Sequence, residues 1–188
     1  MNKDSLSPAE YKEEISKKMN MNEFLMYESI AFMGGNFDDL RNNANNYYLY
    51  FVSGSNYAYI IPYDFDRCFG CGTNGFKNYM TDFSADSTKM QCSGTMQVMS
   101  LYWRTVCRKT NGRPARVDSY YDIYCRNVEM LVNQNKVSVD TFANFVNQYP
   151  KSFGCDPTGS GLGNVSYSLY LSQKLSAIRS NNPEIKIN

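Results

Sequence analysis

Hydrophobic and polar positions along the chain predict a mainly helical protein. Residues 5–18 are charged and helix-prone, and Glu10 stands three positions after Ser7, the spacing of a capping box at a helix start. A second helix is expected over residues 20–33, whose body from Phe24 onward is largely apolar. The pair of glycines that follows ends this helix where a left-handed backbone is needed. Since its body is apolar on most sides, we expect the second helix to be buried.

A β-hairpin is expected next. The segments Asn46–Val52 and Tyr57–Pro62 are rich in aromatic and β-branched residues and are separated by a short run of Ser, Gly and Asn. Asp64-Phe65-Asp66 follows the second strand directly, and residues 70–94 predict a long loop rich in Gly, Asn, Ser and Thr. The predicted fold class is α+β, because further helices are expected over residues 97–109, 119–133, 138–148 and 167–180.

Composition limits the size and the partners of the protein. With 188 residues, of which 43% are hydrophobic and 20% charged, the chain is long enough for one good core, so we expect a single domain over residues 1–188. The net charge of +1 gives no general attraction to nucleic acid or to an anionic membrane. The chain has no apolar run of the roughly 20 residues that cross a bilayer, so no transmembrane segment is expected.

The cysteines leave the compartment and the chemistry open. Six cysteines and sixteen tyrosines favour a secreted or cell-surface protein, in which up to three disulfides can form. A zinc site is the alternative, because Cys68 and Cys71 have the spacing of metal ligands and Cys92 and Cys107 complete a set of thiolates. Ordinary buried thiols are a third interpretation.

An acid, an amide and a second acid surround the two predicted strands. Asp38 follows the second helix, Asn46 opens the first strand, and Asp64 follows the second strand. Phosphoryl transfer needs a carboxylate that orients the attacking hydroxyl and oxygen ligands that hold magnesium against the phosphates. The hairpin brings Asn46 and Asp64 to the same end, as shared metal ligands require. The alternative is structural: a solvated turn at Asp38, an ordinary strand entry, and a corner in which Arg67 pairs with an acid.

The same residues carry a resemblance to a known family. Three segments contain them: Gly35-Asn36-Phe37-Asp38, Asn45-Asn46-Tyr47-Tyr48-Leu49-Tyr50 and Ile61-Pro62-Tyr63-Asp64-Phe65-Asp66-Arg67-Cys68-Phe69-Gly70. These segments resemble the central motifs of the CotH kinase family, the atypical secreted protein kinases similar to spore coat protein H. The resemblance continues more loosely into Leu101-Tyr102-Trp103-Arg104 and the helix after it.

The resemblance implies a kinase-like fold, present here mainly as the helical C-terminal lobe with a small hairpin that carries the metal site. The implied activity is transfer of phosphate from ATP to Ser or Thr of secreted or surface proteins, with Mg²⁺ or Mn²⁺ as the metal. Asp38 is implied as the catalytic acid, and Asn46 and Asp64 as cofactor and metal ligands. Asp66 is implied as a further metal ligand of lower rank, because its side chain should point away from that of Asp64.

Two departures from the family pattern keep other functions open. The smaller lobe, with its nucleotide-contacting lysine, is expected to be absent from this chain, so an active enzyme is expected as part of a longer protein. The second departure is the presence of Cys68 and Cys71 beside the implied metal ligand Asp64. A disulfide between them would stiffen the segment after Asp64. The main alternative is a binding or adhesion module of the cell surface that keeps the fold without catalysis, and a disulfide-rich structural protein is the third possibility.

Overall fold

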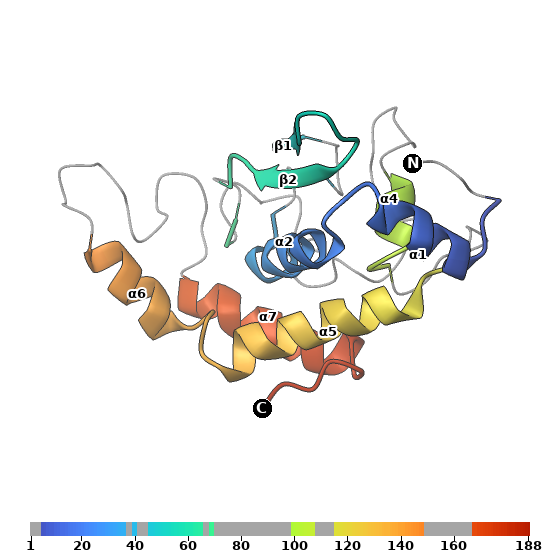
Figure 1. Cartoon of the computed structure of the whole chain (residues 1–188). Coiled ribbons are helices and arrows are strands. Elements are labelled where there is room, and N and C mark those ends of the chain that lie inside the picture. The colour runs from blue at the N-terminus through green and yellow to red at the C-terminus, as the bar shows by residue number, and fades with distance from the viewer. Residues whose placement is uncertain are drawn as a thin grey trace.

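The computed structural model describes residues 5–36, 39–40, 45–65, 68–69, 99–107, 115–148 and 167–188. Within these ranges the chain forms helices and one small antiparallel sheet that lies to one side of them, an α+β arrangement as the sequence predicts (Figure 1). The elements are α1 (Pro8–Ser16), α2 (Met21–Gly34), β1 (Tyr47–Phe51), β2 (Ala58–Pro62), α4 (Met99–Trp103), α5 (Asp118–Asn133), α6 (Val139–Asn147) and α7 (Tyr167–Asn181).

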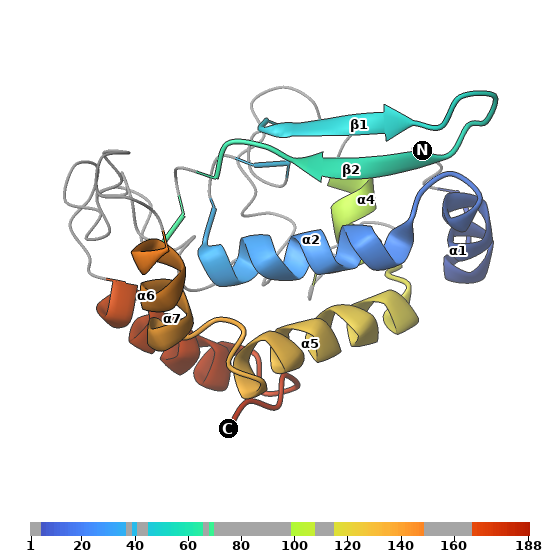
Figure 2. The ribbon, with the colours of Figure 1, turned by 60° about the vertical axis from the view of Figure 1, so that its left-hand side comes forward.

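Helix α2 is the central element of the fold. The hairpin lies along one side of α2 and α5 along the opposite side (Figure 2), and α2 packs against both β2 and α5. Phe24, Leu25 and Phe32 of α2 are completely buried. The predicted burial of this helix is confirmed, because apolar side chains on all sides require packing partners on all sides.

Local signals in the sequence set the helix starts. Ser7 Oγ accepts a hydrogen bond from the Glu10 N–H at 3.3 Å, and the Ser7 N–H donates to Glu10 Oε2 at 2.8 Å, which confirms the capping box of α1. The Asn20 side chain accepts from the Glu23 N–H at 3.4 Å and caps α2 in the same way.

Gly35 ends α2. Its φ of 62° is the left-handed conformation that glycine adopts without steric cost. The Asn36 N–H then donates to the Ala31 carbonyl at 3.2 Å, which satisfies a carbonyl that the helix leaves open. The predicted end of the helix at the glycine pair is confirmed, and the chain leaves α2 in a defined direction.

The hairpin has two different faces. Strand pairing sets Tyr48 opposite Ile61 and Leu49 opposite Ile60. Directly opposite residues share a face, so Leu49 and Ile60 point toward α2, and Ile60 is 1% exposed. Tyr48 and Ile61 lie on the outer face and are exposed.

The segment around α4 differs from the prediction. The sequence predicts a helix over residues 97–109, whereas α4 ends at Trp103. The Val106 N–H reaches the Tyr102 carbonyl at 2.9 Å within a tight turn that follows the helix. Arg104 is 1% exposed, and its guanidinium donates to two backbone carbonyls of other segments. The turn is therefore fixed by contacts distant in sequence, which no local pattern shows.

The last residues of the chain return along α5. The Lys186 N–H donates to Glu129 Oε1 at 2.7 Å, and the Asn188 N–H donates to Asn133 Oδ1 at 3.0 Å. No local pattern in the sequence predicts this return. The remaining predicted helices are confirmed as α5, α6 and α7, each within one residue of its expected bounds.

The described cysteines are buried, and no disulfide joins any two of them: Cys68, Cys107 and Cys125. Burial, followed by the nearby carboxylate of Glu184, raises the pKa of the Cys125 thiol to about 12. The other cysteines of the predicted disulfides lie outside the described residues, as does the predicted loop over residues 70–94: Cys71, Cys92 and Cys155. Among the described helices, none is long and apolar enough to cross a bilayer.

Candidate functional site

The open end of the hairpin brings Asn46 and Asp64 together. Tyr47 pairs with Pro62 at the last position of the sheet, and the Tyr63 N–H donates to the Asn46 carbonyl one step further, at 3.2 Å. Asn46 therefore lies opposite the residue just before Asp64. The predicted placement of both residues at the same end of the hairpin is confirmed, and their role as metal ligands stays a prediction.

Both residues have an unusual backbone conformation. The φ angle is 55° at Asn46 and 52° at Asp64, in the left-handed region. Asn and Asp tolerate this region better than other residues with a side chain, yet it still costs on the order of 1 kcal/mol or more. Among the described residues other than glycine, Phe69 and Asn135 also have a positive φ angle. Strained backbone of this kind is concentrated at ligand-binding sites, and here it occurs at both predicted ligands.

The segment after Asp64 is anchored at both ends by aromatic rings. The Phe65 ring meets the Tyr27 ring of α2 edge-on, with 6.1 Å between centroids. At the other end, Phe69 contacts Tyr167 and Tyr170 of α7, at 5.1 and 5.8 Å. Asp64 itself is exposed. An exposed acid next to a firmly packed segment is held in place while its carboxylate stays accessible.

This segment also returns to the end of α2. The Phe69 N–H donates to the Gly34 carbonyl at 2.7 Å. Gly34 lies so close to Cys68 that an added Cβ would be 3.1 Å from its Sγ atom. The end of α2 and the chain after Asp64 are therefore in direct contact.

Asp38 lies outside the described residues, but its neighbours are placed. Asn36 and Asp39 are both completely buried. The Asn45 N–H donates to the Asp39 carbonyl at 3.3 Å, directly before Asn46. The chain that contains Asp38 is thus joined to the end of α2 on one side and to the hairpin entry on the other.

The donors at this end suit a hard cation. Carboxylate and amide oxygens, as in Asp64 and Asn46, are the ligands that magnesium and manganese prefer. In the described part of the chain, no three His, Cys, Asp or Glu side chains gather closely enough to hold a metal ion. Asp66, the further predicted ligand, lies outside that part, as does Arg67, which the structural alternative pairs with one of the two acids.

The outer face of the hairpin is a feature that sequence reasoning missed. It carries Tyr48, Tyr50, Tyr57, Tyr59 and Tyr63, which we call the tyrosine face. The rings of Tyr48 and Tyr63 are 5.1 Å apart, and those of Tyr57 and Tyr59 are 5.4 Å apart. Exposure is 55% for Tyr48, 56% for Tyr50 and 52% for Tyr63. Alternation along the two strands is the signal that identifies this face.

Comparisons with known proteins address the family. Neither the curated proteins nor the solved structures gave a match to this chain. The comparison with protein families matches residues 1–150 to the family described as CotH kinase protein. This range contains the end of α2, the hairpin and the segment after Asp64. The match extends over most of the chain, and the protein therefore belongs to the CotH kinase family.

Proposed function

We propose that this chain is the helical lobe of a metal-dependent protein kinase that transfers phosphate from ATP to Ser or Thr of secreted or surface proteins. One observation carries the proposal. Asn46 and Asp64 lie at the same open end of the hairpin, where Asn46 is opposite the residue before Asp64, and both have a left-handed backbone. Family membership supports the same activity.

The roles of the residues follow from their chemistry. Asp64 and Asn46 hold the metal ion, with Asp66 as a further ligand. A bound Mg²⁺ or Mn²⁺ supplies positive charge that offsets the charge of the phosphates. Asp38 accepts the proton of the acceptor hydroxyl, which requires a carboxylate near the metal and outside the core.

A non-catalytic binding module of the cell surface is the second candidate. The tyrosine face favours it, because tyrosine offers large, rigid contact area at low entropic cost. Such a module would not depend on the carboxylate of Asp64. The two functions therefore differ in how they respond to a change at this residue.

Thermal unfolding with and without ATP plus magnesium tests the proposal. The parent chain is expected to gain stability, by about 3 kcal/mol when the ligand is present at roughly a hundred times its dissociation constant. Asp64→Asn removes the charge and keeps a residue that tolerates the left-handed backbone, so the gain should disappear. Asp122→Asn is the matched control, because Asp122 is an exposed acid of α5, on the side of α2 away from the hairpin.

Phosphate transfer is measured in parallel as a gain in intact mass of an added Ser/Thr-containing protein. Asp38→Asn is expected to keep the stability gain with nucleotide and to lose transfer. EDTA should abolish both in the parent chain. An equal stability gain in the parent and in Asp64→Asn would refute the assignment of the metal site, and a parent chain without any gain would refute nucleotide binding by this chain.

A further inference from the structure

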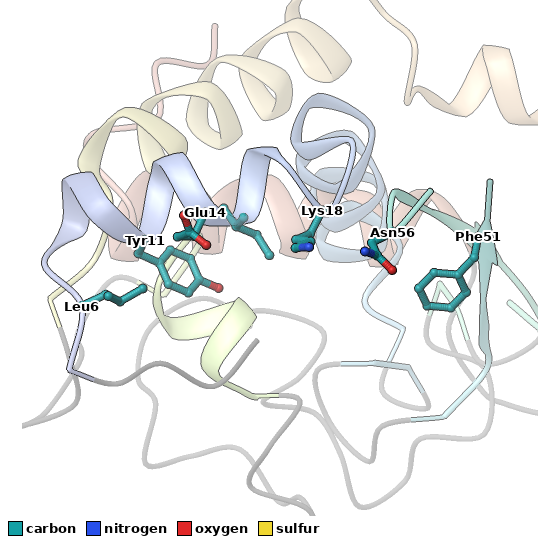
Figure 3. A pocket seen from close by; sticks show the side chains of 7 residues that line it. Leu6, Tyr11, Glu14, Lys18, Phe51 and Asn56 are labelled. Atoms are coloured by element: carbon teal, nitrogen blue, oxygen red, sulfur yellow. The ribbon is translucent and has the colours of Figure 1, made fainter. Parts of the chain in front are cut away.

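A pocket lies at the opposite end of the hairpin from Asn46 and Asp64. It has a volume of about 410 Å³ and opens between α1 and the hairpin tip (Figure 3). Helix α1 contributes three of the lining side chains, and the others come from the residues that flank α1 and from the tip of the hairpin. The lining residues are Leu6, Tyr11, Glu14, Ile15, Lys18, Phe51 and Asn56.

The walls of this pocket are fixed to one another. The Ala58 N–H donates to the Lys18 carbonyl at 2.8 Å, and the Asn20 N–H donates to the Ala58 carbonyl at 3.2 Å. Met19, between them, forms a bridge to Ala58 and is 2% exposed. The link from α1 to α2 is thus joined to the first residue of β2. The pocket is preformed, so a ligand would not have to order it.

Phe51 is an exposed aromatic residue on the otherwise buried face of the hairpin. Strand alternation puts it on the same side as Ala58 and Ile60, which are 0% and 1% exposed, whereas Phe51 is 57% exposed. Its neighbours pack on α2, but Phe51 reaches past that contact to the pocket. The pocket therefore offers an aromatic wall to a partner.

Lys18 and Asn56 supply hydrogen-bond donors at the rim of the pocket. Lys17 lies 3.1 Å from Glu14 and 2.7 Å from Glu13, so it offsets only part of the charge of Glu14. Within the described residues, neither the Lys18 ammonium nor the Asn56 carboxamide has an ion pair or hydrogen bond. In Figure 3 these two side chains lie between Tyr11 and Phe51. Together they present several N–H donors beside an apolar surface.

We propose that this pocket binds a segment of the acceptor polypeptide in which an Asp or Glu neighbours a large apolar residue. The inference rests on the proposed function and adds to it a second contact with the acceptor. The carboxylate would accept hydrogen bonds from Lys18 and Asn56, and the apolar side chain would pack on Phe51 and Tyr11. A β-strand rises about 3.4 Å per residue, so the length of β1 separates the pocket from Asn46 by roughly 17 Å. The docking segment would then lie at least about five extended residues from the phosphorylated hydroxyl.

Selection from a displayed library of random peptides tests the inference, with the full chain as bait. The expected consensus contains an Asp or Glu next to Leu, Ile, Phe or Tyr. A synthetic peptide with this consensus should bind Lys18→Met about two- to fivefold more weakly than the parent, the change that one exposed ion pair supports. Phe51→Ser should also weaken binding. Lys136→Met is the matched control, because Lys136 is an exposed lysine in the turn between α5 and α6.

The outcomes separate this inference from the proposed kinase activity. Asp64→Asn should bind the selected peptide as the parent does, even though it loses nucleotide binding. No enrichment, a consensus without acidic residues, or equal binding by Lys18→Met and the parent would overturn the inference. Selected peptides that bind the parent and Phe51→Ser equally would overturn it as well, because the aromatic wall would then have no part in binding.

Discussion

Replacement of Gly34 by alanine should transmit a steric change from α2 to the segment that follows Asp64. The new Cβ would lie 3.1 Å from Cys68 Sγ and 3.5 Å from Cys68 Cβ, so the sulfur must move by a few tenths of an ångström. The neighbouring backbone resists this shift, because the Phe69 N–H donates to the Gly34 carbonyl at 2.7 Å. Cys68 is 4% exposed and lies in a packed environment.

The free energies set the expected result. Alanine favours a helix over glycine by up to about 1 kcal/mol, and by less at the last helical residue. Overpacking of a core typically costs about 1–3 kcal/mol, and loss of the backbone hydrogen bond would cost about 1 kcal/mol more. Gly34→Ala should therefore lower the free energy of unfolding by about 1–2 kcal/mol. In a Cys68→Ala background the sulfur is absent, and the same change should cost less than about 0.5 kcal/mol or stabilise the protein.

Urea unfolding of the parent, both single variants and the double variant measures this coupling. Nucleotide-dependent stabilisation should also fall in Gly34→Ala and return in the double variant, since Cys68 follows the proposed metal ligand Asp64 by four positions. Additive effects of the two substitutions, within about 0.5 kcal/mol, would refute the proposed contact.

Two further predictions concern buried groups. Tyr170→Phe should lower the free energy of unfolding by about 1–2 kcal/mol, because the buried Tyr170 hydroxyl donates to the Met33 carbonyl at 3.0 Å. An exposed tyrosine of the hairpin changed to Phe is the control, with an expected effect below about 0.5 kcal/mol in urea unfolding. The Cys125 thiol, with its pKa raised to about 12, should react slowly with iodoacetamide at neutral pH in the folded protein and rapidly in urea, as mass spectrometry can follow. Fast alkylation without denaturant would contradict the burial of this cysteine.

Local chemistry made much of the fold predictable. The Ser7 and Glu10 pair, the Asn20 cap and the glycine at position 35 act within a few residues of one another, and each forms the structure that its pattern predicts. The hairpin is equally local, because the two strands are joined by a short turn. The helix expected over residues 97–109 failed for the opposite reason, since its end depends on contacts with distant segments.

The position of the proposed site on the hairpin was predictable from the sequence, but the packing that supports it was not. The order of acid, amide and acid around two strands placed Asn46 and Asp64 at one end of the hairpin. The packing of Phe65 on α2 and of Phe69 on α7 is long-range, and nothing in the sequence pairs these rings in advance. The tyrosine face follows from the alternation of side chains along each strand, once the pairing of the two strands is known.

The left-handed backbone at Asp64 permits a test that separates stability from function. At a φ of 52° glycine is the least strained residue, so Asp64→Gly should raise the free energy of unfolding by up to about 1 kcal/mol, whereas Asp64→Ala should lower it by a similar amount. Both variants lack the carboxylate, so both should lose stabilisation by ATP plus magnesium. If Asp64→Gly is more stable than the parent and yet cannot bind nucleotide, the backbone strain at Asp64 is tolerated because the carboxylate is needed for binding. If Asp64→Gly instead destabilised the protein as much as Asp64→Ala, the carboxylate would have a structural role, and the assignment of Asp64 as a metal ligand would lose its main physical support.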